Sequence, residues 1–594
     1  WQSQIGRETL QKITKKVIPA WKDGLRPVQE DFCSAILDGE DVLCCSATGG
    51  GKSAAFSVPI LALHEYNKNP TLYPAGLRTR LNPVGIVVTP TKGLASNIVL
   101  ELGHLNVAAF AYSRESLAEA RRSGVSLADE IKGCEKWQVV CVDPEHLKTK
   151  EWREISEFPL WRDNVLYGAG DEVHLIKEWG ADFRVDFRFI GLFFRGRLPA
   201  TASVVALSAT LAPGKDTSAV CQSLGLFDGQ FHLIRRTNER PNIHFVMQTL
   251  SHGLSGYEFP DIIPFLKSRR KTIFHFNSLE MLFRFYVYIW RSQPRTANKM
   301  RRTRMYTSLC SAEYNRETIR LIDEDPECQI VLATIAFANG IHAKSLLDSV
   351  TIGCSTTTLD IMWQGTGRAG REEGTQARGV VLVQKSTLTL ARKYLDSPPR
   401  PTKGKGSRKH KHSETMNLAK AQLLTESNCY IAFLNTHYEN PPLEISTLDC
   451  LAAKRPLPCS LCLARSGKTL SFPAPASTPT LPAWTFASSS KRSYGGSRKL
   501  KLTRKEREKS QTPLNKFRNS IRSQEHKNGR FLEHPQTMFL PASIQTSLLD
   551  NLLLISSLSD MEQFLQKWRH RAAHAAGLYR VVTKIQKNIR ADRE

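Results

Sequence analysis

The sequence predicts an α/β protein with two tandem parallel-sheet domains, a small helical module and a largely disordered basic C-terminal region. Three observations support this prediction. Short, unbroken apolar runs alternate with helix-like stretches through residues 1–390, which is typical of parallel strands buried on both faces. A glycine-rich motif directly follows the first of these runs. After residue 466, polar and basic residues replace the alternating pattern, and such composition buries too little apolar surface to order itself.

The predicted strands are runs of β-branched and other apolar residues. They cover residues 42–45, 85–89, 138–143, 203–207, 272–276, 329–334 and 380–383. A break around residues 225–242 divides these runs into two groups. We therefore predict domains over residues 1–228 and 229–390.

The bulk composition restricts the partners of this chain. Its 594 residues carry a formal net charge of +26, so polyanions are the expected partners. Membrane-surface binding is the other interpretation of a basic chain, but no apolar run approaches the length of a membrane span. The 13 cysteines lie mostly within apolar runs, which indicates a reducing compartment. Because the chain begins with Trp1, we expect a fragment without its upstream sequence.

The glycine-rich motif has the composition of a loop that binds nucleotide phosphates. Glycines let backbone N–H groups approach a polyanion, a lysine contacts the outer phosphates and a hydroxyl binds Mg²⁺. The following helix adds its positive dipole end. The motif therefore predicts ATP binding and hydrolysis. Its residues are Ala47, Thr48, Gly49, Gly50, Gly51, Lys52 and Ser53.

An acidic pair supplies the other groups that ATP hydrolysis needs. Asp171 is expected to hold Mg²⁺ through water, and Glu172 to orient and deprotonate the attacking water. Acidic pairs are usually solvated surface residues. Here the pair ends an apolar stretch, and the segment 208–210 (Ser-Ala-Thr) closes the next predicted strand, which favours a catalytic role.

With these motifs in order, the chain resembles the RecQ family of superfamily 2 DNA helicases over about residues 20–465. The resemblance implies two RecA-like domains, ATP and Mg²⁺ as cofactors, and 3′→5′ translocation on single-stranded DNA with duplex unwinding. It also implies that Arg26 and Gln29 bind the adenine, as in the family's segment at residues 25–29. Residues 89–94 and 143–145 resemble the segments that contact the DNA backbone.

Residues 174–184 resemble the family's aromatic-rich loop, which couples DNA binding to hydrolysis. Trp179 and Phe183 are expected to stack on unpaired bases and Arg184 to contact phosphate. The alternative is that these aromatic residues pack in a core. Thr334, in a motif of the second domain, is a further expected DNA contact.

Residues 364–371 (Gln-Gly-Thr-Gly-Arg-Ala-Gly-Arg) resemble the family's arginine-finger motif. We expect Gln364, Arg368 and Arg371 to act in catalysis, because two closely spaced arginines can cross a cleft and stabilise the γ-phosphate.

Four cysteines in the module at residues 391–465 predict a structural zinc site, since four thiolates close a tetrahedral site. The family carries such a module in this position, and the alternative is a set of incidental free thiols. The cysteines are Cys429, Cys450, Cys459 and Cys462.

Several positions depart from the family pattern. Glycines interrupt the strand before Asp171. Asn97 stands where the family generally has Gln, Gly365 where it often has Glu, His342 where it often has Asp, and Thr307 near the place of a family His. No segment after residue 465 resembles a winged helix. Two alternatives therefore stay open, a catalytically degenerate DNA-binding protein and an RNA helicase or duplex translocase.

The C-terminal part is predicted as a disordered basic linker (466–530) and a helical tail (531–594). In residues 491–530, lysine and arginine far outnumber glutamate, so this segment is either a solvated arm or a patch for nucleic acid or nuclear import. We expect a nuclear protein. An apolar stripe from Met561 to Trp568, after a predicted capping box of Ser559 and Glu562, indicates a helix for core packing or partner docking.

Overall fold

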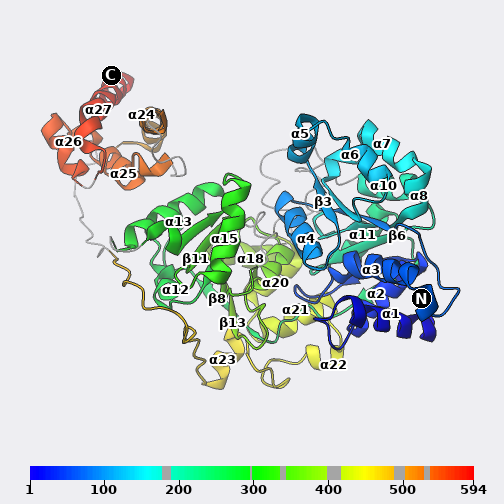
Figure 1. Ribbon diagram of the computed structural model, residues 1–594. Helices are drawn as coiled ribbons and strands as arrows, with labels where there is room; N and C mark the ends of the chain where they lie inside the picture. Colours follow the sequence, from blue (N-terminus) through cyan, green and yellow to red (C-terminus); the bar gives the residue numbers. More distant parts are fainter. Residues whose placement is uncertain are drawn as a thin grey trace.

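The computed structural model contains two parallel β-sheets, each with helices on both faces, and a helical domain at the C-terminal end (Figure 1). It describes residues 1–176, 189–294, 298–334, 343–397, 416–486, 502–527, 536–566 and 568–593. The predicted fold of two parallel-sheet α/β domains is confirmed. Within the described residues, no helix combines the length and the apolar character needed to cross a membrane.

Lobe 1 is built on a seven-stranded sheet with the order β3-β4-β2-β5-β6-β1-β7, and every pair is parallel. Its strands are β1 (Asp41–Cys45), β2 (Val84–Val88), β3 (Ala109–Tyr112), β4 (Val139–Val142), β5 (Val165–Gly170), β6 (Ser203–Ser208) and β7 (Phe231–Arg235). Its helices are α1 (Gln4–Val17), α2 (Pro27–Asp38), α3 (Ala54–Lys68), α4 (Lys92–His104), α5 (Arg114–Arg122), α6 (Leu127–Lys132), α7 (Lys150–Glu157), α8 (Pro159–Asn164), α10 (Ile190–Arg197) and α11 (Lys215–Leu224).

The two faces of this sheet belong to two separate cores. Successive strand residues point to opposite faces, so Val42 and Cys44 of β1 pack with α1–α4. Leu43 and Cys45 pack with α5–α8, α10 and α11 on the other face. Helices on both faces explain why the central strands are continuously apolar.

The glycines of β5 make room for large neighbours rather than weakening the strand. A Cβ on Gly168 would lie 2.5 Å from Leu198 and 2.9 Å from the ring of Phe194 in α10. The Tyr167 hydroxyl donates a hydrogen bond to the Phe56 carbonyl in α3 at 2.7 Å. All six residues of β5 are buried, so this strand forms a full central member of the sheet.

Lobe 2 is built on a six-stranded parallel sheet with the order β10-β11-β9-β12-β13-β8. Its strands are β8 (Ile243–Thr249), β9 (Thr272–Phe276), β10 (Thr303–Tyr306), β11 (Ile330–Thr334), β12 (Asp348–Ile352) and β13 (Ala377–Val383). Its helices are α12 (Ile263–Lys267), α13 (Leu279–Ser292), α14 (Lys299–Arg302), α15 (Ala312–Glu324), α17 (Leu359–Thr366) and α18 (Lys385–Asp396).

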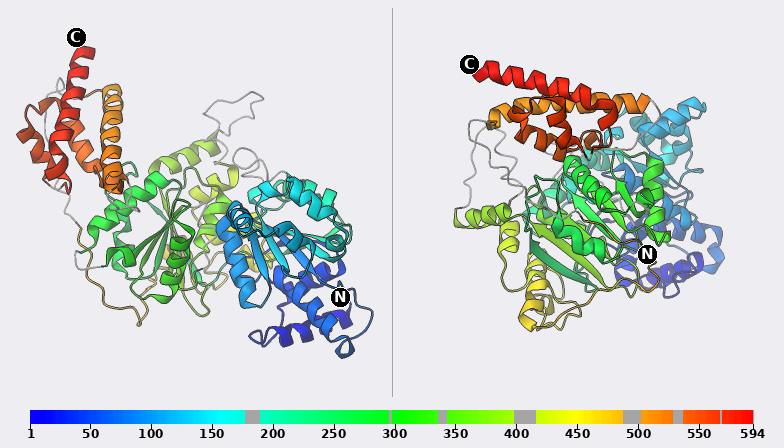
Figure 2. Two further views of the ribbon diagram at one scale, coloured as in Figure 1. Left: turned by 45° about the horizontal axis from the view of Figure 1, so that its top comes forward. Right: turned by 90° about the vertical axis from the view of Figure 1, so that its left-hand side faces the viewer.

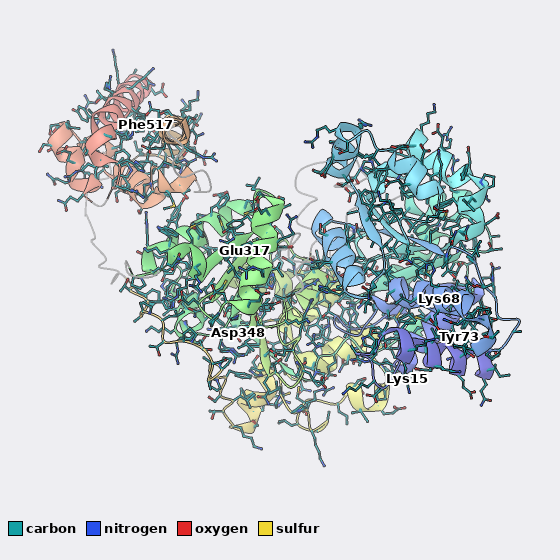
Figure 3. The ribbon with its side chains drawn as sticks, in the orientation of Figure 1. Lys15, Lys68, Tyr73, Glu317, Asp348 and Phe517 are labelled. Carbon is teal, nitrogen blue, oxygen red and sulfur yellow. The ribbon has the colours of Figure 1, made fainter. Side chains whose placement is uncertain are left out.

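A buried ion cluster lies inside lobe 2 at the start of β12. The Asp348 carboxylate is fully buried and accepts hydrogen bonds from Arg270 Nε at 3.0 Å and from Arg378 Nη2 at 2.6 Å (Figure 3 labels Asp348). Two arginines therefore compensate one carboxylate that could not be buried alone.

A small module follows lobe 2 and shares its core. The module helices are α20 (Leu418–Thr425), α21 (Tyr430–Tyr438), α22 (Leu443–Ser446) and α23 (Ser460–Ser466). Leu434 and the four cysteines pack with Phe245 of β8 and Met362 of α17. The module also holds the chain between the lobes, because Arg455 Nε lies 2.7 Å from a Glu239 carboxylate oxygen.

The first part of the predicted disordered linker is ordered along lobe 2. After α23 the chain passes beside α12 toward the C-terminal domain (Figure 1). Arg302 lies 4.0 Å above the Trp484 ring and donates to the Pro482 carbonyl at 2.8 Å. Thr485 donates its backbone N–H to the Ser292 carbonyl at 2.8 Å. Single contacts such as that of Trp484 with Arg302 therefore hold this polar segment on lobe 2. The composition of the segment does not predict such contacts.

The C-terminal part folds into a helical tail domain. Its helices are α24 (Arg504–Lys527), α25 (Ala542–Asp550), α26 (Leu558–Leu565) and α27 (Arg571–Arg593). The structure therefore differs from the predicted linker, because α24 is helical and buries Leu514 and Ile521 against the other tail helices. Met561 and Trp568 are buried in the same core, as the core-packing alternative predicts. The capping box is formed by Ser557 and Asp560 rather than by the predicted pair.

Lobe 1 extends beyond its predicted boundary at residue 228, because β7 pairs with β1. This strand lies at the sheet edge and is only half-buried, so its apolar signal is weak.

Candidate functional site

The phosphate-binding motif forms the turn between β1 and α3. Gly49 and Gly51 both have φ of 80°, a left-handed conformation that glycine adopts without strain. The Lys52 ammonium lies along the loop and donates to the carbonyls of Ser46 at 2.7 Å and Ala47 at 2.9 Å. The turn thus presents backbone N–H groups, an ammonium and the N-terminus of α3 at one point.

The predicted adenine segment lies against this loop. Gln29 is buried and donates its amide N–H to the Gly51 carbonyl at 3.2 Å. Its amide oxygen accepts the backbone N–H of Arg26 at 3.0 Å. Gln29 therefore joins the start of α2 to the loop, and the structure places Arg26, Gln29 and Thr48–Ser53 in one region of lobe 1.

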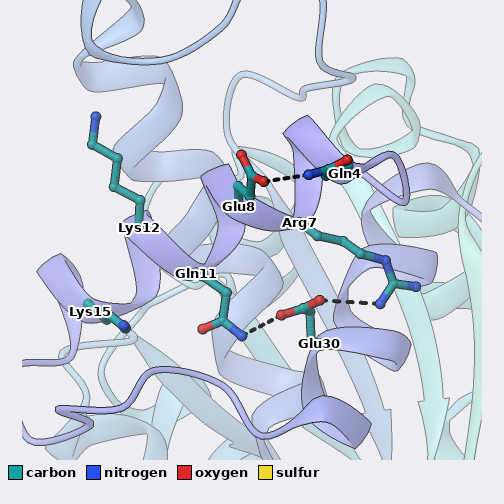
Figure 4. Close-up of a pocket in the computed structure, with 7 residues that line it drawn as sticks. All are labelled: Gln4, Arg7, Glu8, Gln11, Lys12, Lys15 and Glu30. Carbon is teal, nitrogen blue, oxygen red and sulfur yellow. Dashed lines mark hydrogen bonds and ion pairs between the residues drawn. The ribbon is translucent and has the colours of Figure 1, made fainter.

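Helix α1 supports this segment from outside. The Gln11 side chain donates to and accepts from the backbone of Leu25. Figure 4 shows the ion pair of Arg7 with Glu30, whose atoms lie 3.3 Å apart. A shallow groove of about 760 Å³ runs along α1, and Lys12 and other polar side chains line it. These contacts fix where α2 begins and hence the position of Gln29.

The acidic pair lies at the carboxyl end of β5, opposite the loop. Burial and the adjacent Glu172 raise the pKa of Asp171 to about 7, and Lys52 opposes this shift. Glu172 has φ of 50°, a conformation that costs a non-glycine residue about 1–3 kcal/mol and that is concentrated at functional sites. A divalent cation beside Asp171 would compensate two crowded carboxylates, so these residues fit the predicted Mg²⁺ site together with the Ser53 hydroxyl.

Glu172 connects the two lobes. Its Oε1 atom accepts a hydrogen bond from Gln364 Nε2 in α17 at 2.6 Å and lies 3.7 Å from Arg368 Nη2. Its Oε2 atom is buried and accepts no hydrogen bond from the described residues, although His174 Nδ1 lies 3.5 Å away. His174 in turn pairs with the Ser208 hydroxyl at 3.1 Å, which links the acidic pair to the end of β6.

Both predicted arginines lie at this junction. Burial lowers the pKa of Arg368, while Glu172 and Asp171 oppose the shift. Burial also lowers the pKa of Arg371 to about 9, and repulsion from Arg368 and Arg240 adds to that effect. Three guanidinium groups crowded beside a phosphate loop form a site for a highly charged anion.

The sequence analysis missed one of these three, Arg240, as a site residue. Its guanidinium donates to the carbonyls of Thr48 at 3.2 Å and Gly367 at 3.4 Å, and also to that of Gly370. It therefore joins the phosphate loop to the arginine motif. Arg240 stands in an Arg-Pro-Asn segment directly before β8, where a single arginine has no spacing pattern that marks it as a site residue.

Glu101 in α4 is a second missed residue. Burial raises the pKa of the Glu101 carboxyl, and the nearby Arg371 and the hydroxyl of Ser53 oppose that shift. A single acidic residue in an amphipathic helix carries no sequence signal of such a position.

The predicted DNA contacts are only partly described. Thr334 ends β11 at the carboxyl edge of the lobe 2 sheet, beside Phe276 of β9. Trp179, Phe183 and Arg184 lie outside the described residues, so their role stays a prediction.

The four predicted zinc ligands come together although the last lies 33 positions after the first in the chain. All four are buried, and their sulfur atoms lie within 4.8 Å of one another. Cys429 Sγ lies 3.6 Å from Cys450 Sγ and 3.9 Å from Cys459 Sγ. Tetrahedral zinc with Zn–S bonds of about 2.3 Å needs S–S separations of about 3.8 Å, which agrees with both distances. These distances exclude disulfides and fit a metal. Cys462 completes the set.

The two parallel-sheet α/β lobes, like those of RecA-type helicases, meet at a shared site that suits a nucleotide phosphate. Residues 26–217 match the family described as DEAD/DEAH box helicase. The chain thus contains a DEAD/DEAH helicase domain, and its homologues include RecQ helicases.

Three relatives illustrate this similarity. The chain is 27% identical to the ATP-dependent helicase SGS1 of Saccharomyces cerevisiae over 59% of its own length and 22% of the relative. It is 25% identical to the ATP-dependent DNA helicase RecQ of Haemophilus influenzae over 63% of its own length and 53% of the relative. It is also 25% identical to the putative ATP-dependent RNA helicase R290 of Acanthamoeba polyphaga mimivirus over 61% of its own length and 58% of the relative. The chain therefore spans less than two thirds of each relative.

Proposed function

We propose that this protein is an ATP-dependent DNA helicase that moves 3′→5′ along single-stranded DNA and unwinds duplex. The observation that carries the proposal is the contact of Glu172 in lobe 1 with Gln364 and Arg368 in lobe 2. A triphosphate held by the Lys52 loop would lie between these groups, so its cleavage would change the contact between the lobes.

In this proposal the chain divides the chemistry of hydrolysis between its lobes. Lys52 and Ser53 hold phosphate and metal, Asp171 binds the metal, and Glu172 orients and deprotonates the attacking water. Arg368 and Arg371 stabilise the charge of the transition state, and Gln364 positions Glu172. Arg26 and Gln29 hold the base. Bound Mg²⁺ would neutralise charge on the β- and γ-phosphates.

The four cysteines are proposed as a structural zinc site. Because the module also contacts Glu239 between the lobes, the metal would stabilise the connection between them as well as the module itself.

The test is phosphate release by the wild-type protein and by Lys52→Ala, with single-stranded DNA, duplex DNA and RNA as separate stimulants. We expect stimulation by single-stranded DNA in the wild type and loss of hydrolysis in the variant. Equal rates for the two proteins would leave the degenerate DNA-binding protein as the better account.

An RNA helicase is the second candidate, and the similarity to the mimiviral putative RNA helicase favours it. Stronger stimulation by RNA than by single-stranded DNA would select it. Strand polarity is tested separately, with duplexes that carry a 3′ or a 5′ overhang. A nuclear location stays a prediction.

A further inference from the structure

A cleft of about 850 Å³ lies between lobe 2 and the tail domain. The tail domain packs beside α13 of lobe 2, where Arg291 donates to the Ser543 hydroxyl at 3.3 Å (Figure 2). The cleft has one wall from α13 and the chain after β10, and another from α24 and α25. Its size falls within the range of ligand-binding pockets. Its lining includes Tyr257, Arg284, Thr307, Asn515, Arg518 and Arg522.

Helix α24 has two distinct faces. Leu514 and Ile521 are buried in the tail core, and Phe517 packs partly against them (Figure 3 labels Phe517). An adjacent stripe faces the cleft and repeats at the spacing of one helical surface. It consists of Gln511, Asn515, Arg518 and Arg522. Thus the helix needs its apolar face to fold, while its amide and guanidinium groups face lobe 2.

The cleft is positively charged and contains an aromatic ring. Among the described residues, its lining includes Arg284, Arg518 and Arg522 and one carboxylate, that of Glu280. The Glu280 side chain is 84% exposed, and its Oε1 atom lies 3.9 Å from Arg284 Nε. Burial raises the pKa of the Tyr257 phenol, and nearby guanidinium groups, including those of Arg284 and Arg518, oppose the shift. Arginines around an aromatic ring, with amide side chains beside them, are the groups that bind phosphates and stack on bases.

The cleft also lies at the functional edge of the lobe 2 sheet. Thr307 directly follows β10, and α13, which starts at Leu279, follows β9. Strand β11 pairs with both β9 and β10 and ends at Thr334 at the same edge. In parallel α/β sheets, ligands bind at this carboxyl edge. A strand that contacts Thr334 would therefore have the cleft as its neighbour.

We propose that this cleft binds a segment of single-stranded nucleic acid, so that the tail domain and lobe 2 together close around the strand. Arg518 and Arg522 contact phosphates from the tail side, Arg284 from the lobe side, and Tyr257 stacks on a base. The inference rests on the proposed function for its ligand, and it assigns the tail domain a role that the motor motifs do not supply.

The experiment uses the full chain and a fluorescein-labelled single-stranded oligothymidylate. We expect the double variant Arg518→Glu/Arg522→Glu to bind about tenfold more weakly, and the slope of log affinity against log salt to fall by about 0.7 for each phosphate that the variant no longer neutralises. Arg284→Glu, on the other wall, should also weaken binding. Lys516→Glu is the matched control, because Lys516 is an exposed residue of the same helix outside the cleft.

Basal ATP hydrolysis without DNA is measured on the same proteins and should be unchanged, because none of these residues lies at the nucleotide site. The double variant Arg518→Gln/Arg522→Gln removes the two charges without reversing them. Its melting temperature, compared with that of the wild type, tests whether weaker binding results from unfolding. Equal affinity of wild type and both double variants would overturn the inference, as would an equal loss in Lys516→Glu. Failure of the wild type to hydrolyse ATP with any polynucleotide would instead overturn the proposed function.

Discussion

Lobes 1 and 2 share a parallel-sheet architecture but present different groups to the nucleotide site. Lobe 1 supplies a backbone turn, Lys52 and the acidic pair, all at strand ends. Lobe 2 supplies long side chains, Gln364 and two arginines, from α17 and the chain after it. The cores differ as well, since lobe 2 buries the Asp348 ion cluster whereas lobe 1 adjusts its packing through glycines in β5. The same fold thus places a backbone turn and acidic groups on one side of the site and long polar and basic side chains on the other.

Removal of the metal should cause the largest difference between the stabilities of the two lobes. Chelation of zinc, or Cys459→Ser, should unfold the module and destabilise lobe 2, because they share a core. Lobe 1 should keep its own thermal transition. Calorimetry with zinc analysis tests this, with Cys221→Ser, a buried thiol of lobe 1, as control. Zinc well below one equivalent in pure folded protein would contradict the site.

The different groups that the two lobes supply should have different effects on ATP hydrolysis and on nucleotide binding. Arg371→Ala should lower kcat by about 10³–10⁵-fold, because one finger arginine stabilises transition-state charge, while nucleotide affinity changes little. Single-turnover hydrolysis and binding of a fluorescent ATP analogue measure the two effects. Arg320→Ala, at an exposed arginine of α15, should leave both unchanged. A purely lower affinity in Arg371→Ala would place this residue in binding rather than catalysis.

The buried ion cluster of lobe 2 should dominate its stability. Asp348→Ala leaves Arg270 and Arg378 without their carboxylate and should lower the free energy of unfolding by about 3–5 kcal/mol. Denaturant titration measures this value. Asp396→Ala, at an exposed position of the same lobe, should stay close to wild type. A destabilisation no larger than that of the control would mean that water reaches the cluster.

The smallest effect concerns the packing of lobe 1. Gly168→Ala should cost about 1–3 kcal/mol, because the new Cβ would lie 2.5 Å from Leu198 and must displace α10. Gly196→Ala, within α10 and with no atom inside 4 Å of the new Cβ, should be neutral or slightly stabilising. Similar melting temperatures for the two variants would show that the contact between β5 and α10 is adaptable.

Sequence patterns identified mainly the central strands, and the exceptions have physical causes. The edge strands β3, β7 and β8 are missing from the predicted runs, because a partly exposed strand mixes polar with apolar residues. The edge strand β10 was missed although it is buried, because two of its four residues are the polar Thr303 and Arg304. The central strand β12 was also missed. Its Asp348 and Ser349 are buried with partners from distant segments, so local hydrophobicity understates its burial.

The sequence alone determined the fold class, the phosphate loop, the acidic pair and the arginine motif, because each depends on residue types at short spacings. It also indicated the four cysteines, although their spacing is longer. Only the tertiary structure decided which groups meet. The contacts of Glu172 with Gln364, of Arg240 with Thr48, and the cleft between α24 and lobe 2 join residues far apart in the chain. Such contacts follow from the packing of whole domains, which no local pattern encodes.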